Sequence, residues 1–215
     1  MLQIGAVFYP GFEMLDMFGP LEMFSMLGSE QVTINTIAEQ AGPVVTAVAA
    51  DIQAGPKVVA DLTFADAPQM DLLLIPGGFG TLPELANENL MTFIRQQAAG
   101  AKIVASVCTG SALLAKAGVL DGHKATSNKQ MFVLATQQSD QVEWVSEARW
   151  VVSGKFYTSS GVSAGTDMAV AIIQELYGDD VRQNVINGAE YTWNNDPSND
   201  PFAGELNKLA GLLPA

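Results

Sequence analysis

The feature that most constrains the fold is a repeated alternation of short apolar runs with segments of helical periodicity. Two of these runs, Leu72–Ile75 and residues 102–107, are rich in aliphatic residues, and each stops at a turn of glycine and other small residues. Aliphatic runs of this length are typical of strands buried on both faces, and the helical segments between them supply the crossovers that parallel strands need. The sequence therefore predicts an α/β fold with a mostly parallel sheet covered by helices on both faces.

The same pattern predicts the individual elements. Strands are expected at residues 3–9, 32–38, 72–75, 102–107, 124–127, 142–144, 149–153 and 156–158, with a hairpin or edge excursion of short strands within residues 43–62. Helices are expected at residues 14–27, 82–99, 110–117, 129–137, 163–177 and 180–188. The first should begin properly near Pro20, a favoured first-turn residue, and the second should end at Gly100. We expect one domain over residues 1–215, with its core at about residues 3–190 and an irregular tail that holds a short helix near residues 206–212.

The composition excludes several classes of protein. A chain of 215 residues with 48% hydrophobic content builds a full core without a disulfide or metal. Its net charge of −13, from 10 Lys+Arg against 23 Asp+Glu, repels nucleic acid. No run approaches the roughly 18–20 apolar residues of a membrane span, and the N-terminus reads as a strand, not as a signal peptide. A single cysteine excludes an internal disulfide and suits a reducing cytoplasm, and we find neither a metal-ligand cluster nor a phosphate loop.

The strongest chemical signal is the lone cysteine, Cys108. It follows the buried strand at residues 102–107 and precedes an Ala/Leu-rich helix, so it lies on a tight strand–turn–helix junction. The positive end of the helix is expected to lower the pKa of the thiol, and strain at the junction should hold the side chain exposed at the sheet edge. The alternative is a small cysteine buried in the core. The junction favours a nucleophile.

Two further features follow strands that end at the same edge of the sheet. Gly77 and Gly78 end the strand Leu72–Ile75, where their N–H groups can approach a ligand as an oxyanion site requires, or simply terminate the strand. Asp16 lies among apolar residues after the first strand. Burial there would raise the pKa of its carboxyl group and make it a general acid or base beside the thiol, whereas an exposed Asp16 would only cap the helix.

Other candidate residues are less specific. His123 is the only histidine, but its turn connects a helix to the next strand and should lie at the opposite edge from Cys108, so a Cys–His dyad is not expected. Thr158, Ser159, Ser160 and Gly161 precede an apolar helix, where the hydroxyl groups either face the pocket or cap the helix.

Four motifs together resemble the DJ-1/PfpI superfamily, within the class I glutamine amidotransferase-like proteins, and its isocyanide hydratase-like branch in particular. They are Phe8-Tyr9-Pro10 with Asp16-Met17-Phe18-Gly19-Pro20, then Ile75-Pro76-Gly77-Gly78, then residues 106–111 (SVCTGS), then residues 158–167 (TSSGVSAGTD). The resemblance extends from about residue 3 to about residue 190. It implies a flavodoxin-like three-layer sandwich, a homodimer, Cys108 as the nucleophile and Asp16 as the carboxylate that contacts it.

The resemblance also bears on the reaction. Thr109 follows the cysteine, as in the hydratase branch, where the protease-like branch has a histidine. Hydratase-like relatives tend to carry His and Trp where this chain has Asn128 and Lys129, so the substrate stays open at this point. The same domain also occurs in AraC-type regulators, which add a basic helix-turn-helix tail that this chain does not carry.

We therefore expect a cofactor-free hydratase or lyase that acts on a small electrophile, such as an isocyanide converted to an N-substituted formamide. Its catalytic residues would be Cys108, Asp16 and Thr109. The substrate or oxyanion would contact Gly77, Gly78, Ser160 and Gly161, without metal. The alternatives are a thiol-based redox sensor or stress protein, a glyoxalase-like enzyme acting on 2-oxoaldehydes, and a ligand-binding module without chemistry.

Overall fold

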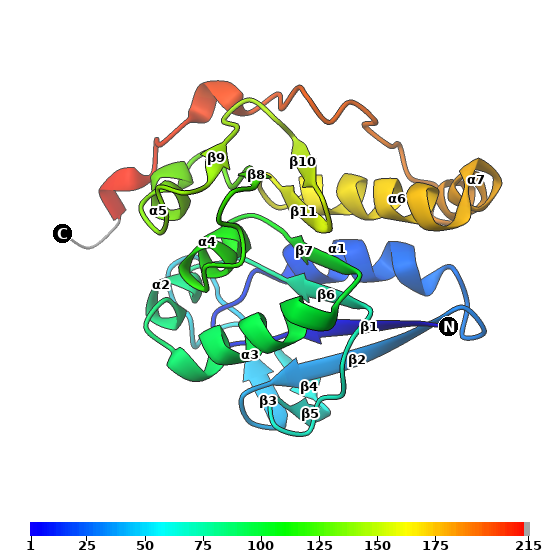
Figure 1. Ribbon diagram of the computed structural model, residues 1–215, viewed down its shortest axis with the longest axis horizontal. Coiled ribbons are helices and arrows are strands. Elements are labelled where there is room, and N and C mark those ends of the chain that lie inside the picture. The colour runs from blue at the N-terminus through cyan, green and yellow to red at the C-terminus, as the bar shows by residue number, and fades with distance from the viewer. Residues whose placement is uncertain (213–215) are drawn as a thin grey trace.

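The computed structural model describes residues 1–212 and contains a seven-stranded sheet with helices on both faces (Figure 1). The strands lie in the order β10-β11-β7-β6-β1-β2-β5, and all neighbours are parallel except β10 and β11. The parallel strands β1, β2, β6, β7 and β11 therefore follow the 2-1-3-4-5 order of flavodoxin-like sheets. Their bounds, with those of the two edge strands, are β1 Leu2–Val7, β2 Val32–Ala38, β5 Leu62–Thr63, β6 Leu72–Ile75, β7 Ile103–Ser106, β10 Trp150–Ser153 and β11 Phe156–Ser159.

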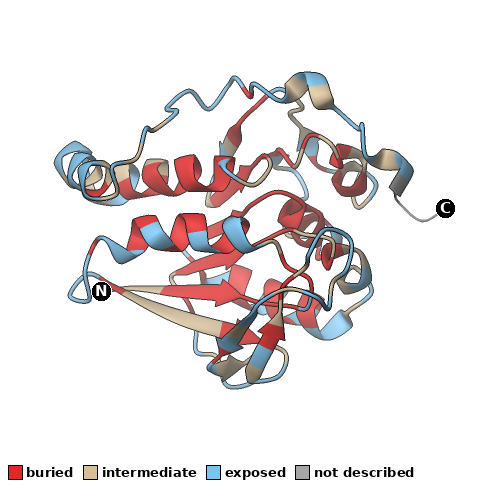
Figure 2. Cartoon of the chain, turned by 180° about the vertical axis from the view of Figure 1, so that it is seen from behind, coloured by how far each residue is buried: buried red, intermediate tan, exposed pale blue. Residues whose placement is uncertain are grey.

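The helices form two layers, which confirms the predicted three-layer sandwich. Helices α1 (Met14–Ser25) and α6 (Ala164–Tyr177) lie side by side on one face (Figure 2), and α3 (Glu88–Gly100) and α4 (Gly110–Lys116) lie on the other. The short helices α2 (Thr81–Glu84) and α5 (Phe132–Thr136) pack against α4, and α7 (Asp179–Gly188) packs against α6. The tail adds two short 3-10 helices, η1 (Ala203–Glu205) and η2 (Ala210–Leu212), and η2 lies within the range of the short helix expected near residues 206–212.

Two small sheets complete the structure. Strands β3 (Gly42–Val45) and β4 (Lys57–Ala60) form an antiparallel hairpin, as expected for residues 43–62. Strands β8 (Lys124–Ala125) and β9 (Glu143–Trp144) pair in parallel beside β10. Among residues 1–212, no helix combines the length and the apolarity needed to cross a membrane.

The expected start of the first helix near Pro20 is wrong, because α1 begins at Met14 and contains Pro20. The reason lies in packing against α6. A side chain at Gly19 would place its Cβ 2.3 Å from Thr166 Oγ1, so the Gly-Pro pair serves a close contact between the two helices. Tertiary packing of this kind overrides the local preference of proline for a helix start. Asp16 consequently lies in the first turn of α1 and not in a loop.

The expected helix over residues 82–99 is divided into α2 and α3. Asn87 ends the continuity, because its side-chain oxygen accepts hydrogen bonds from the N–H groups of Asn89 (3.1 Å) and Leu90 (3.2 Å). An asparagine in this role begins a new helix. The expected helix over residues 129–137 is also shorter, since residues 126–131 form a loop before α5.

The central strands carry the core and position the site. Every residue of β6, β7 and β11 is buried. Because β1, β6, β7 and β11 are parallel, their carboxyl ends share one edge of the sheet. The segments that follow them, which carry Asp16, Gly77, Cys108 and Ser160, meet at that edge.

Candidate active site

Cys108 occupies a strained junction between β7 and α4. Its φ angle is +58°, a left-handed conformation that costs a non-glycine residue about 1–3 kcal/mol. The backbone is held on both sides, because the Cys108 N–H donates to Ser160 O (3.0 Å) and its carbonyl accepts from Ser127 Oγ (3.1 Å). Gly110 permits the tight turn, since a Cβ there would lie 2.5 Å from Ile75 O. The predicted strained junction is confirmed.

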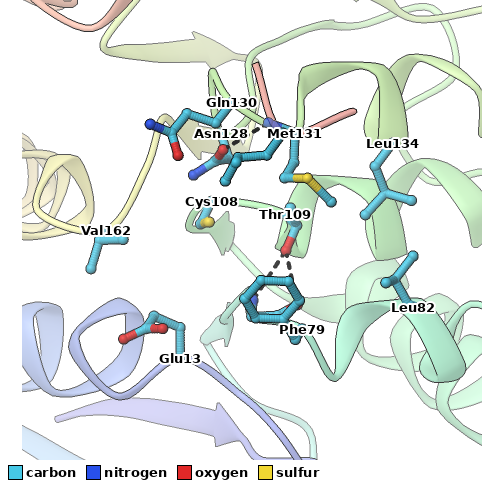
Figure 3. A pocket seen from close by; sticks show the side chains of 12 residues that line it. Glu13, Phe79, Leu82, Cys108, Thr109, Asn128, Gln130, Met131, Leu134 and Val162 are labelled. Carbon is cyan, nitrogen blue, oxygen red and sulfur yellow. Dashed lines mark hydrogen bonds between the residues drawn. The ribbon is translucent and has the colours of Figure 1, made fainter. Parts of the chain in front are cut away.

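The Cys108 side chain is one of those that line a pocket of about 170 Å³ (Figure 3). Only 6% of Cys108 is exposed, so the expectation of an exposed side chain is wrong, and reagents reach the thiol through the pocket. The walls are mainly apolar, and their apolar side chains come from four parts of the chain: Phe79, Leu82, Met131, Leu134, Val162 and Leu209.

The pKa of the Cys108 thiol is raised well above its ordinary value, which overturns the expected lowering. Burial is the larger cause, and the neighbouring Asp16 carboxylate adds to it. Three N–H donors act in the opposite direction through hydrogen bonds to the sulfur, from the Thr109 backbone, the Asn128 side chain and the Val162 backbone. The resting group is therefore a neutral thiol surrounded by donors that favour its ionised form once it is created.

Asp16 is fully buried beside this thiol. Its Oδ2 accepts the Gly77 N–H at 2.8 Å, while its Oδ1 has no nitrogen or oxygen partner within residues 1–212. Burial raises the pKa of this carboxyl group to about 8, against smaller lowering effects of the Gly77 and Cys108 hydrogen bonds. The raised pKa confirms the prediction. The capping alternative is wrong, since Glu13 is the N-cap of α1. With a pKa of about 8, the carboxyl group of Asp16 is mainly protonated at neutral pH.

Gly78 lines the cysteine pocket, but the N–H groups of Gly77 and Gly78 are both bonded within the protein. The Gly77 N–H is taken by Asp16, and the Gly78 N–H donates to Thr109 Oγ1 at 3.1 Å, so neither is free for a ligand. Both glycines instead allow close approach, because a Cβ at Gly77 would lie 2.5 Å from Thr109 N and one at Gly78 would lie 2.5 Å from Glu13 N. They bring α1 and the cysteine junction together.

The Thr109 side chain is part of a buried hydroxyl chain. Its Oγ1 lies 2.9 Å from Thr81 Oγ1, which lies 3.1 Å from the Tyr9 hydroxyl, and Tyr9 donates to Pro76 O at 2.6 Å. These bonds hold the turn after β6 against the turn after β7. The backbone N–H of Thr109 faces the sulfur, while its side chain faces away into this chain.

Ser160 and Gly161 lie beside the cysteine pocket but do not line it. They border a second pocket of about 270 Å³, which shares Asn128, Gln130 and Val162 with the first. The Ser160 carbonyl holds the Cys108 N–H, and the small size of Gly161 leaves space for Asn128, whose Nδ2 would lie 2.8 Å from a Cβ.

Asn128, which is not among the site residues predicted from the sequence, lines the cysteine pocket. Its Oδ1 accepts the Met131 N–H at 3.0 Å, and this bond turns the amide nitrogen toward Cys108 (Figure 3). Lys129 points the other way and is buried, with Nζ donating to Thr126 Oγ1 (2.8 Å) and Ala148 O (2.6 Å). The only signal in the sequence was the departure of these two residues from the His and Trp of hydratase-like relatives.

His123 lies at the opposite edge of the sheet, as expected. Its ring packs on Phe156, the first residue of β11, with ring centres 4.7 Å apart. Cys108 lies at the other end of that strand, where its N–H donates to the carbonyl of Ser160, the residue after the strand. Within residues 1–212, no group of three or more His, Cys, Asp or Glu side chains is arranged to hold a metal ion.

Comparisons with known proteins place these features in context. A model of the DJ-1/PfpI family matches residues 4–175. Isonitrile hydratase from Pseudomonas putida is 36% identical over 191 residues, which cover 88% of this chain and 78% of that protein. A THiJ/PfpI family protein from Pseudomonas syringae superimposes with a TM-score of 0.79 at 30% identity, covering 98% of this chain and 84% of its own. DJ-1beta from Drosophila melanogaster shares the fold, with a TM-score of 0.76 at 20% identity. The superposition covers 89% of this chain and 99% of DJ-1beta.

Proposed function

The chain belongs to the DJ-1/PfpI family, and from this membership and the geometry of its site we propose that it is a cysteine-dependent hydratase that converts isocyanides to N-substituted formamides. The observation that carries the proposal is Cys108, which lines an apolar pocket, beside the fully buried carboxyl group of Asp16, where burial raises the pKa of both groups. An isocyanide is uncharged and needs a nucleophile and a proton at the same carbon atom. The pair supplies both.

The first step is addition of the thiol to the terminal carbon of R–N≡C. Sulfur forms the new bond to carbon, the proton on Asp16 passes to that carbon, and the thiol proton returns to the Asp16 carboxylate. The product is a thioimidate, R–N=CH–S–Cys108, and no net charge is created. The N–H groups of Thr109, Asn128 and Val162 stabilise the negative charge that develops on sulfur during the transfer.

Water completes the reaction. It adds to the thioimidate carbon with one proton going to nitrogen, which gives R–NH–CH(OH)–S–Cys108. Collapse of the hydroxyl group to a carbonyl breaks the C–S bond, and Asp16 carries the hydroxyl proton to the departing sulfur. The formamide R–NH–CHO leaves, and both side chains return to their resting protonation states. A positioned acid/base of this kind contributes about 10²–10⁴ in rate.

Turnover of cyclohexyl isocyanide tests the proposal, with N-cyclohexylformamide measured by mass spectrometry. The natural protein should produce the formamide, and Cys108→Ala should not, at equal circular dichroism. 2-Oxoaldehydes and amides belong in the same screen. Isocyanide turnover that persists in Cys108→Ala would end the mechanism, and turnover of 2-oxoaldehydes alone would favour the glyoxalase-like alternative.

The redox-sensor alternative has less support. A sensor cysteine is an exposed thiolate, whereas Cys108 is 6% exposed and burial raises its pKa. What supports this alternative is sequence similarity to DJ-1 proteins, such as dj-1beta from Drosophila melanogaster at 28% identity over 127 residues. We place the reaction in the cytoplasm, where a free cysteine remains reduced.

We also infer a homodimer. Helix α1 presents Met14, Leu15 and Phe18 to solvent at 37%, 46% and 44% exposure, and their spacing places them on one side of the helix. A cluster of large apolar side chains on one exposed helix face marks an interaction surface. A second copy of the chain is the occupant expected from the family resemblance.

A further inference from the structure

The C-terminal segment, residues 190–212, crosses the top of the molecule from α7 to the neighbourhood of α5 (Figure 1). It lies outside the part of the chain that matches the family model, residues 4–175. The segment has little secondary structure of its own, yet it is fixed at several points. The Pro197 carbonyl accepts the N–H groups of Arg149 (2.8 Å) and Trp150 (3.3 Å) at the start of β10.

A buried cluster of charges holds the middle of this segment. Arg149 pairs with Asp167 of α6 at 2.6 Å, and Asp167 Oδ1 accepts the Tyr191 hydroxyl at 2.9 Å. Asp200 of the segment lies between two cations, 3.9 Å from Arg149 Nη1 and 3.9 Å from Lys129 Nζ. The side chains of Lys129 and Asp200 are each 1% exposed. Because an uncompensated buried charge is costly, the cluster fixes where the segment lies.

The end of the segment is bonded to the loop that carries Asn128. The Asn207 N–H donates to Lys129 O at 2.8 Å, its side-chain oxygen accepts the Val133 N–H at 2.8 Å, and the Leu209 N–H donates to Gln130 O at 3.0 Å. These three bonds place the Leu209 side chain in the wall of the cysteine pocket. Leu206, in the same segment, does not line it.

We propose that Leu209 is a specificity-determining residue, which the clamped C-terminal segment places in the wall of the cysteine pocket to limit the size of the group attached to the reacting carbon. As a statement about isocyanides, this rests on the proposed function. An apolar cavity of about 150 Å³ holds a benzene molecule, and the pocket here measures about 170 Å³. The substrate class is thus a compound whose apolar substituent is no larger than one six-membered ring.

The test uses the single cysteine as a reporter of access. The natural protein, Leu209→Ala and Leu209→Phe are treated with methyl methanethiosulfonate and with benzyl methanethiosulfonate, and the mixed disulfide on Cys108 is timed by intact mass. Leu206→Ala is the matched control, because Leu206 and Leu209 are similarly exposed, at 39% and 36%. The quantity compared is the ratio of the benzyl rate to the methyl rate.

Leu209→Ala should raise this ratio about tenfold, since groups of one to a few methylenes in an apolar pocket discriminate by that factor or more. Leu209→Phe should lower it, and Leu206→Ala should leave it unchanged. Equal ratios in Leu209→Ala and Leu206→Ala would overturn the proposal. The ratio of kcat/KM for cyclohexyl and isopropyl isocyanide should move in the same direction. The thiosulfonate ratio tests the role of Leu209 whether or not isocyanides are substrates. Failure of the proposed function would appear instead as absence of isocyanide turnover.

Discussion

Replacing Asp16 by asparagine should make the protein more stable and much less active. The carboxyl group is fully buried and its pKa is raised from 3.8 to about 8, mainly by burial. An asparagine of the same shape keeps an oxygen for the Gly77 N–H and has no ionised form to bury. The substitution therefore removes a destabilising group that we propose is retained for its proton.

The magnitude follows from the pKa of Asp16 in the two states. Between pH 3.8 and about 8 the folded protein holds a proton that the unfolded chain has released, so stability is lost as pH rises through this range. Each pH unit corresponds to about 1.4 kcal/mol per proton. The advantage of Asp16→Asn over the natural protein should consequently grow by about 4 kcal/mol between pH 5 and pH 8, and level off at higher pH.

Urea unfolding from pH 5 to pH 8.5 measures this difference, with the exposed Asp180→Asn as the control that should show no such trend. Other groups with shifted pKa values, such as Lys129, contribute equally to the pH dependence of unfolding in both proteins, so their contributions cancel in the difference. Isocyanide turnover measured in parallel should fall by about 10²–10⁴. A stability difference that does not change with pH, or an Asp16→Asn protein that is less stable at pH 8, would refute the assignment of a buried proton to Asp16.

Three further predictions concern the surroundings of the cysteine. Asn128→Ala removes an N–H donor to the sulfur and should shift the pH profile of iodoacetamide alkylation to higher pH. Gly161→Ala should act in the same direction, because its Cβ would lie 2.8 Å from the Asn128 amide nitrogen. Unshifted profiles would exclude Asn128 as a donor to the sulfur. Hydrogen peroxide should oxidise Cys108 more slowly than free cysteine by intact mass, and rapid addition of two oxygens would favour the sensor. Phe18→Glu should convert a dimer to a monomer in sedimentation velocity, and an unaltered mass would place the interface elsewhere.

The fold was predictable because the signals in the sequence are strong and local. Strands such as Leu72–Ile75 are buried at every residue, and this one ends at the turn Pro76-Gly77-Gly78. The rule that parallel strands share a carboxyl edge then places Asp16, Gly77 and Cys108 together without any side-chain detail. For the same reason His123 could be assigned to the far edge.

What the sequence could not predict depends on contacts between distant segments. The start of α1 is decided by Gly19 against Thr166 of α6, about 150 residues later in the chain. The orientation of Asn128 depends on a bond to Met131 and on the space left by Gly161. The place of Leu209 depends on Asp200 lying between Arg149 and Lys129. Neither propensity nor spacing carries such information.

The pKa of Cys108 was predicted with the wrong sign because two opposing effects differ in size. A helix N-terminus stabilises an anion by about 0.3–2 kcal/mol, and α4 has only seven residues. Burial of an ion costs several kcal/mol, and the sulfur is almost entirely enclosed, with Asp16 next to it. Burial therefore prevails for both groups, and the resting site holds two protons and no charge. A site of this kind is suited to an uncharged electrophile that needs sulfur and hydrogen on one carbon atom, since the charge appears only while the proton moves.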